Sequence, residues 1–253
     1  MPISHRRLPI QSISILMALA SLALPLTGHA ATGASQSLSD LYKQAIASPI
    51  RTSDDREADT RRIPLAFLKL TGVKPGMRVL DVSAGGGYST QLLALVVGKS
   101  GKVWAQGPSI RSGLKDRLSA HPQKNIVPVA LPFDNPVPHG VSNLDLITLI
   151  FNYHDLAYMG VDRRQMDKHL FQALKHGGYM VVIDHSAKPG EGTTVAKTLH
   201  RIDEAVVKKE FKEAGFRIDE ESNAFRNPAD PRTQPFFKMS MPTDSFAIRF
   251  IKP

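Results

Sequence analysis

The residues best suited to acid–base chemistry follow two apolar segments, at 144–151 and 179–183. They are Asn152, Tyr153, His154, Asp155, Asp184 and His185. A neutral histidine can take a proton from a hydroxyl or an amine as that group attacks an electrophile. We therefore expect a catalytic set here, with His154 as the first choice for the base and His185 as the alternative. Helix capping and loop hydrogen bonding are the competing structural roles of the same residues.

A second segment consists of small residues between an apolar run at 78–82 and a helical pattern at 88–97. Its members are Ser83, Ala84, Gly85, Gly86 and Gly87. Missing side chains let a ligand approach the backbone, and a helix N-terminus offers N–H groups to an anion. The competing structural explanation is that a tight connection between a strand and a helix would need the same glycines. Because Thr90 stands where the dinucleotide pattern has its third glycine, we do not expect a nicotinamide cofactor.

The sequence predicts no metal site. It contains no cysteine, which excludes disulfides, thiolate metal ligands and a cysteine nucleophile. A divalent cation held by acids after the two apolar segments is an open alternative. However, no second pair of carboxylates stands in register with the first.

Alternating strands and helices must position these segments. We expect strands at 78–82, 102–106, 126–130, 144–151, 179–184, 216–221 and 245–251, and helices at 38–46, 53–61, 64–70, 88–97, 111–118, 162–174 and 203–214. This alternation predicts an α/β fold with a doubly wound, mostly parallel sheet. Such sheets bind ligands beyond the carboxyl ends of their strands, where all the segments above would meet.

The first 30 residues have the pattern of a secretory signal peptide. His5, Arg6 and Arg7 precede an apolar stretch of twelve residues at 13–24, and small residues lead to Ala31. Twelve helical residues extend about 18 Å, which is too short for a ~30 Å bilayer core and argues against a permanent membrane anchor. We expect cleavage after Ala30 and an exported protein, which in a Gram-negative bacterium is periplasmic.

The formal charge of +9 comes from 32 basic and 23 acidic residues, and the basic residues are scattered. Without a basic run that includes aromatic residues, a nucleic-acid partner is not expected. A solvated basic surface explains the charge.

The small-residue segment resembles the first motif of class I S-adenosylmethionine-dependent methyltransferases. Their pattern of an acid followed by alternating glycines is matched by Asp81, Ser83, Gly85 and Gly87, with serine in place of the first glycine. Supporting turns occur in the family's order, at 75–76 before the first strand, 174–178 before the fifth and 214–216 before the sixth.

This resemblance implies a seven-stranded, Rossmann-like sheet over 73–253, a helical extension or lid over 31–72, and S-adenosylmethionine as cofactor. In the family, an acid after the second strand binds the ribose hydroxyls. Gln106 stands here instead, and Asp134 would contact the adenine amine. The implied cofactor-binding residues are Asp81, Ser83, Ala84, Gly85, Gly86, Gly87, Gln106 and Asp134. Arg56, Asp59 and Arg62 have the spacing of an ion-pair set on the lid, but a solvated helix face is the commoner explanation of such spacing.

Three further segments, at 152–155, 185–190 and 200–203, resemble the corresponding segments of a narrower family of exported, predicted bacterial methyltransferases. The resemblance implies methyl transfer to a small-molecule nucleophile. The alternative is a non-catalytic ligand-binding protein that retains the fold. Nucleic-acid methylation fits the charge but not the residues at 152–155, which are not the Asn-Pro-Pro-aromatic tetrad.

Overall fold

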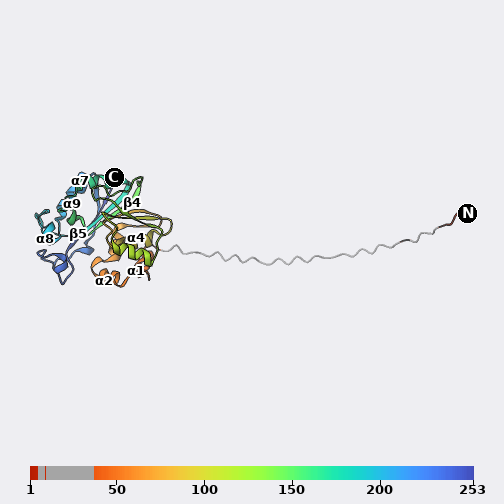
Figure 1. The fold of residues 1–253 in the computed structure, drawn as a ribbon, viewed down its shortest axis with the longest axis horizontal. Helices are drawn as coiled ribbons and strands as arrows, with labels where there is room; N and C mark the ends of the chain where they lie inside the picture. Colours follow the sequence, from red (N-terminus) through yellow and green to blue (C-terminus); the bar gives the residue numbers. More distant parts are fainter. Residues whose placement is uncertain (5–8, 10–36) are drawn as a thin grey trace. The chain divides into compact units, whose positions relative to one another are not determined.

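The computed structural model describes residues 1–4, 9 and 37–253 (Figure 1). The expected signal peptide and its cleavage site therefore lie almost wholly outside the described residues. By its internal contacts the chain divides into Met1–Ser35 and the folded unit Gln36–Pro253. No helix among the described residues is long and apolar enough to cross a membrane.

A seven-stranded sheet forms the centre of the folded unit. Its strands are β1 (Arg78–Val82), β2 (Lys102–Gly107), β3 (Ile126–Ala130), β4 (Leu144–Ile150), β5 (Leu174–His185), β6 (Arg217–Glu221) and β7 (Ser245–Ile251). They lie in the order β3-β2-β1-β4-β5-β7-β6. All pairs are parallel except the two made by β7, which is antiparallel to β5 and β6. The predicted doubly wound, mostly parallel sheet is thus confirmed.

Helices cover both faces of this sheet. They are α1 (Leu38–Ala47), α2 (Ser53–Arg62), α3 (Pro64–Thr71), α4 (Tyr88–Val97), α5 (Ser112–Ala120), α6 (Tyr153–Leu156), α7 (Arg163–Ala173), α8 (Ala196–Leu199) and α9 (Glu204–Glu213). Leu146 of β4 belongs to a core cluster with α1, α3 and α4, whereas Ile147 packs with α7 and α9. Because successive strand residues point to opposite faces, the middle of β4 needs apolar side chains on both faces, and Leu146, Ile147 and Leu149 supply them.

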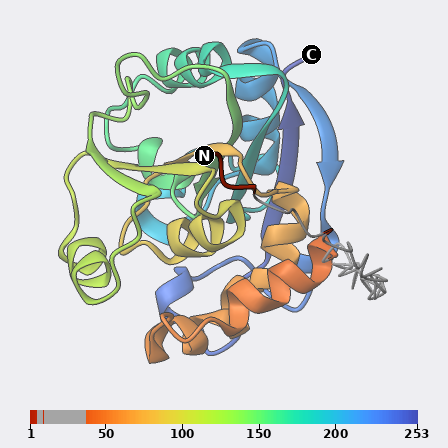
Figure 2. The same ribbon diagram turned by 90° about the vertical axis from the view of Figure 1, so that its right-hand side faces the viewer.

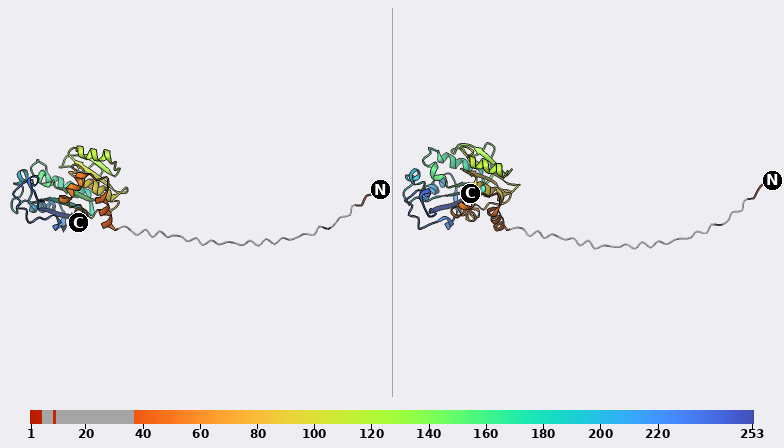
Figure 3. Two further views of the ribbon diagram at one scale, coloured as in Figure 1. Left: turned by 90° about the horizontal axis from the view of Figure 1, so that it is seen from below. Right: turned by 60° about the horizontal axis from the view of Figure 1, so that its bottom comes forward.

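The segment expected to be an N-terminal extension contains three separate helices between Leu38 and Thr71. A capping box of Thr52 and Asp55 starts α2, Pro64 occupies the first turn of α3, and Gly72 ends α3 with a φ of 59°. These signals place the helix boundaries close to those expected from the sequence. The orange α1–α3 segment lies beside α4 in Figures 2 and 3.

The turn expected at 175–178 is wrong, because β5 begins at Leu174 and runs through it. Leu174 pairs with Leu144, but the next pairing is Tyr179 with Leu146. The residues of β5 between Leu174 and Tyr179 therefore outnumber those of β4 and form a bulge. Gly177 has a φ of 73°, and a Cβ on Gly178 would lie 2.9 Å from the carbonyl oxygen of Lys175. Both glycines are therefore needed to keep the bulge within the strand. The short helices α6 and α8 were not predicted.

Candidate active site

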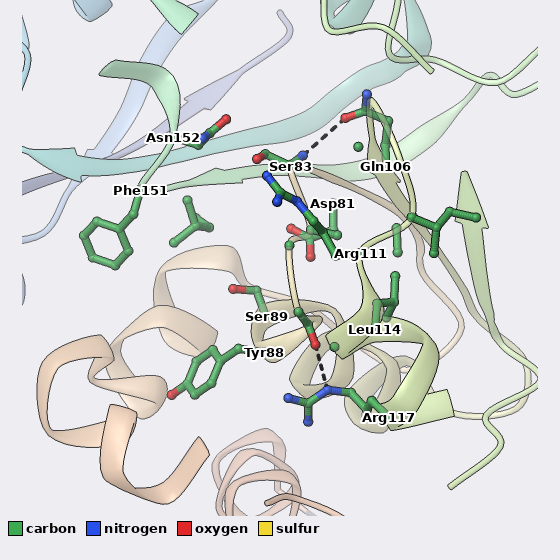
Figure 4. Close-up of a pocket in the computed structure, with 18 of the residues that line it drawn as sticks. Asp81, Ser83, Tyr88, Ser89, Gln106, Arg111, Leu114, Arg117, Phe151 and Asn152 are labelled. Carbon is green, nitrogen blue, oxygen red and sulfur yellow. Dashed lines mark hydrogen bonds between the residues drawn. The ribbon is translucent and has the colours of Figure 1, made fainter. Parts of the chain in front are cut away.

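A cavity of about 860 Å³ lies beyond the carboxyl ends of β1, β2 and β4 (Figure 4). Its wall combines the glycine-rich turn, the segment from Gln106 to Arg117, the start of the chain after β4, and one side of α2. This is the edge of the sheet at which ligands of doubly wound folds bind. The structure therefore brings most of the expected cofactor residues to one place.

The glycines of the turn have different tasks. Gly85 and Gly87 have positive φ values of 56° and 86°, a region that side chains disfavour. A Cβ on Gly87 would also lie 2.8 Å from Leu114, so this glycine lets α5 pack closely. A Cβ on Gly86, by contrast, would meet nothing within 4 Å. Gly86 thus keeps the cavity open without being required by the backbone.

Asp81 anchors the turn from beneath. Its carboxylate is 2% exposed and accepts hydrogen bonds from Thr90 at 2.5 Å and Thr148 at 2.7 Å. Burial raises the pKa of Asp81 to about 6, although the two hydroxyl donors act in the opposite direction. Ser83, with a φ of 57°, occupies the position expected to hold a glycine.

Two further cofactor predictions have different outcomes. Gln106 borders the cavity, but its Oε1 accepts from the backbone N–H of Ser83 at 3.2 Å and its Nε2 donates to the carbonyl of Leu131 at 2.7 Å. Since both ends of the amide bind the backbone, Gln106 holds two loops together and is not free for ribose hydroxyls. Asp134 is not among the residues that line the cavity, whereas its neighbour Phe133 is.

Helix α2 closes one side of the cavity through ion pairs that sequence reasoning missed. Asp55 accepts two hydrogen bonds from Arg117, at 2.6 and 2.8 Å. Asp59 pairs with Arg51 and accepts from the Tyr88 hydroxyl at 2.6 Å, so the ion-pair set considered as an alternative within α2 does not form. The capping-box pattern was the available signal for Asp55, but its partner lies 62 residues away.

Arg62 lies differently from the other basic residues of α2. Its guanidinium carbon is 4.9 Å from the ring centre of Tyr88 and 5.6 Å from that of Phe151. Within residues 37–253, no hydrogen bond or ion pair joins Arg62 to an acidic side chain. Burial lowers the pKa of Arg62. A half-buried cation at a cavity wall, without an acidic partner among the described residues, is suited to bind an anionic ligand group.

The residues after β4 separate into two groups. Asn152 and Asp155 line the cavity and are joined by a hydrogen bond of 3.1 Å. Tyr153 is fully buried on the other side, where its hydroxyl contacts Asp167 at 2.8 Å and Glu210 at 2.6 Å. The expected catalytic role of Tyr153 is therefore wrong, because a four-residue helix turns its side chain into the core.

His154 lies between two carboxylates. Its Nδ1 is 2.7 Å from Asp184 and its Nε2 is 3.1 Å from Asp155. Burial alone would lower the pKa of His154, but the two carboxylates outweigh it and raise this pKa to about 10. With a carboxylate at each ring nitrogen, the raised pKa favours the protonated imidazole over the neutral form when no other ligand is bound. This corrects the expected role of His154 as a neutral general base.

His185 is neutral but enclosed. Its ring is stacked between Phe151 and Phe236, with centroid distances of 4.6 and 4.5 Å, and its Nδ1 contacts Thr243 at 2.8 Å. Burial lowers the pKa of His185 to about 3. His185 is 7% exposed and does not line the cavity, so the structure does not place it where a base would reach a ligand.

The strand order, the antiparallel β7 and the cavity after β1 define the fold of class I methyltransferases. An S-adenosylmethionine-dependent methyltransferase from Aquifex aeolicus matches with a TM-score of 0.58, covering 86% of this chain and all of that one at 20% identity. A methyltransferase structure from Bacillus halodurans matches with a TM-score of 0.56 at 17% identity, over 74% of this chain and 97% of its own. These likenesses establish the fold.

Sequence comparisons indicate the same class over part of the chain. The family model for protein-L-isoaspartate(D-aspartate) O-methyltransferase matches residues 47–126. The ubiquinone/menaquinone biosynthesis C-methyltransferase UbiE of Laribacter hongkongensis is 31% identical over 121 residues, and its Neisseria gonorrhoeae counterpart is 30% identical over 124. Each alignment covers 47% of this chain. The chain spans about half the length of these relatives, 47% and 48%.

Proposed function

We propose that this chain is an exported S-adenosylmethionine-dependent methyltransferase that acts on a small-molecule nucleophile. The observation that carries the proposal is the cavity of about 860 Å³ beyond β1, β2 and β4, with the exposed Gly85 and Gly86 on its wall. The methyltransferase relatives support the activity. The leader pattern at 1–30 supports export, and the scattered basic residues support a small-molecule acceptor over a nucleic acid.

The residues of the cavity fit this cofactor in three respects. The turn at Gly86 leaves space that a Cβ would fill, so the methionine part can lie against the backbone. Arg62, whose guanidinium has no acidic partner among the described side chains, can pair with the methionine carboxylate. Phe133, in the loop after β3, supplies an apolar surface for the adenine. The fit is weaker at the ribose, because the amide of Gln106 is already bound at both ends.

S-adenosylmethionine supplies a methyl group on a sulfonium, which a nucleophile can attack without acid catalysis. The protein's contribution is then mainly alignment of the reacting atoms and exclusion of water. Asn152 and Asp155 border the cavity next to Phe151, and a carboxylate there can accept a hydrogen bond from the acceptor's hydroxyl or amine. This arrangement needs neither His154 nor His185 as a base.

Calorimetric titration of the full chain with S-adenosylmethionine and with its demethylated product tests the proposal. Gly86→Val places a side chain in the cavity at a position without positive φ, so the fold should survive while affinity falls by roughly tenfold or more. Circular dichroism and thermal unfolding provide the control for folding. If neither ligand binds the unaltered chain, the fold serves a different ligand, and the non-catalytic alternative replaces this proposal.

A further inference from the structure

The donor atoms of His154, Asp155 and His200 form a cluster at the edge of the cavity. His154 Nε2 lies 3.1 Å from Asp155 Oδ1, and His200 Nδ1 lies 3.0 Å from the same oxygen. All three donor atoms are within 4.8 Å of one another. Donors that share one metal ion at about 2.1 Å are themselves roughly 3.0–3.4 Å apart, so little movement is needed for a common ion.

Asp184 orients the buried histidine toward this cluster. Its Oδ1 lies 2.7 Å from His154 Nδ1, and its Oδ2 accepts from the backbone N–H of His154 at 2.8 Å. With Nδ1–H donating to Asp184, a metal ion that displaces the proton from Nε2 finds the lone pair of that nitrogen directed at the cluster. A carboxylate behind a ligating histidine is the usual support of metal-bound imidazoles.

Nε2 of His154 is the independent sign of a missing ligand. His154 is 1% exposed, and Nε2 has no hydrogen-bond partner among the described residues despite its proximity to Asp155. Native structures rarely leave a buried polar atom in this state. The nearby Oδ1 of Asn152 is likewise buried and without a partner in the described part of the chain.

The charge of the cluster indicates the kind of ion. With both imidazoles neutral, as metal binding requires, Asp155 and Asp184 leave a net charge of −2, which a divalent cation balances. Two nitrogens and one oxygen favour zinc or a similar transition metal over magnesium. Three protein ligands also leave coordination positions open, as in catalytic zinc sites, and Asp155 lies on the cavity wall.

We propose that His154, Asp155 and His200 bind one divalent transition-metal ion of the zinc type, with Asp184 holding His154 in place. The open positions would face an acceptor that bears an oxygen ligand. This departs from the absence of a metal predicted from the sequence, because His200 lies 45 residues from its partner Asp155. The proposal that the chain binds a metal does not depend on the proposed methyltransferase function. A role of that metal in methyl transfer rests on the proposed function.

Calorimetry of the metal-stripped full chain with ZnCl₂ and, separately, with MgCl₂ tests the site. We expect one Zn²⁺ per chain and Mg²⁺ binding that is weaker by at least about 100-fold. His200→Asn should weaken Zn²⁺ binding by roughly 100-fold. Because His200 is a quarter exposed, this variant should fold even if His154→Asn does not. His139→Asn, an exposed histidine outside the cluster, should leave Zn²⁺ affinity unchanged.

Asp184→Asn adds a test of the supporting carboxylate, with an expected loss of about 10–100-fold in Zn²⁺ affinity. The proposal is overturned if the unaltered chain does not bind Zn²⁺ stoichiometrically, or if His200→Asn and Asp155→Asn bind it equally well. Titration with S-adenosylmethionine separates the two proposals. Zn²⁺ binding without cofactor binding rejects only the methyltransferase function, and the reverse rejects only the metal site.

Discussion

At the scale of a single residue, the position of Arg62 in the fold determines whether its charge is solvated or available to bind a ligand. In the sequence it is one of several arginines on a polar helix, and a solvated helix face is the commoner explanation of it. In the structure its guanidinium lies over Tyr88 and Phe151 at the cavity wall, without an acidic partner among the described side chains. A bound carboxylate would satisfy it.

Replacing Arg62 with Gln should therefore weaken S-adenosylmethionine binding by about 1.5–3 kcal/mol, the usual range for a hydrogen bond to a charged group. Calorimetry measures this loss, and decarboxylated S-adenosylmethionine should bind both proteins equally. Arg56→Gln, on the exposed side of the same helix, is the matched control. Equal weakening by both substitutions would show a general effect of charge instead.

At the scale of elements, a buried cluster joins α6, α7 and α9. The Tyr153 hydroxyl contacts both Asp167 and Glu210, yet its single hydrogen can serve only one carboxylate. A proton on Asp167 resolves the conflict, and burial raises the pKa of Asp167 to about 8. The folded state then holds a proton that the unfolded state has released above pH ~4.

This proton makes the free energy of unfolding fall as pH rises from about 4 to about 8, by at most about 1.4 kcal/mol per unit for this group. Asp167→Asn imitates the protonated acid and should remove this contribution. Urea unfolding at several pH values, compared with Asp116→Asn on the exposed face of α5, measures the difference. An unchanged pH dependence in Asp167→Asn would mean that Asp167 is ionised in the folded protein.

At the scale of the whole molecule, all the described residues that line the cavity, together with His154, Asp155 and His200, belong to the folded unit from Gln36 onward. We therefore expect that removal of 1–30 leaves a competent protein that starts at Ala31. Mass spectrometry of the protein from its native compartment checks this terminus. Recovery of a chain that still begins at Met1 would contradict both cleavage and the proposed export.

The sequence by itself determined the alternation of elements, the mostly parallel sheet and the glycine-rich turn. These depend on local signals: apolar runs for β1 and β4, a capping box for α2, and glycines where φ is positive. Periodicity and chain-breaking residues act over a few positions, so they can be recognised without tertiary contacts.

The tertiary structure alone decided which side chains face the cavity and what charge they carry. Tyr153 and His154 are adjacent, but the short helix α6 sends the first into the core and the second between Asp155 and Asp184. Gln106 matches the ribose position in order, yet two backbone contacts occupy its amide. Burial and contacts with residues distant in the chain determine where each of these side chains points and what its pKa is. The spacing of residues in the sequence carries no information on either property.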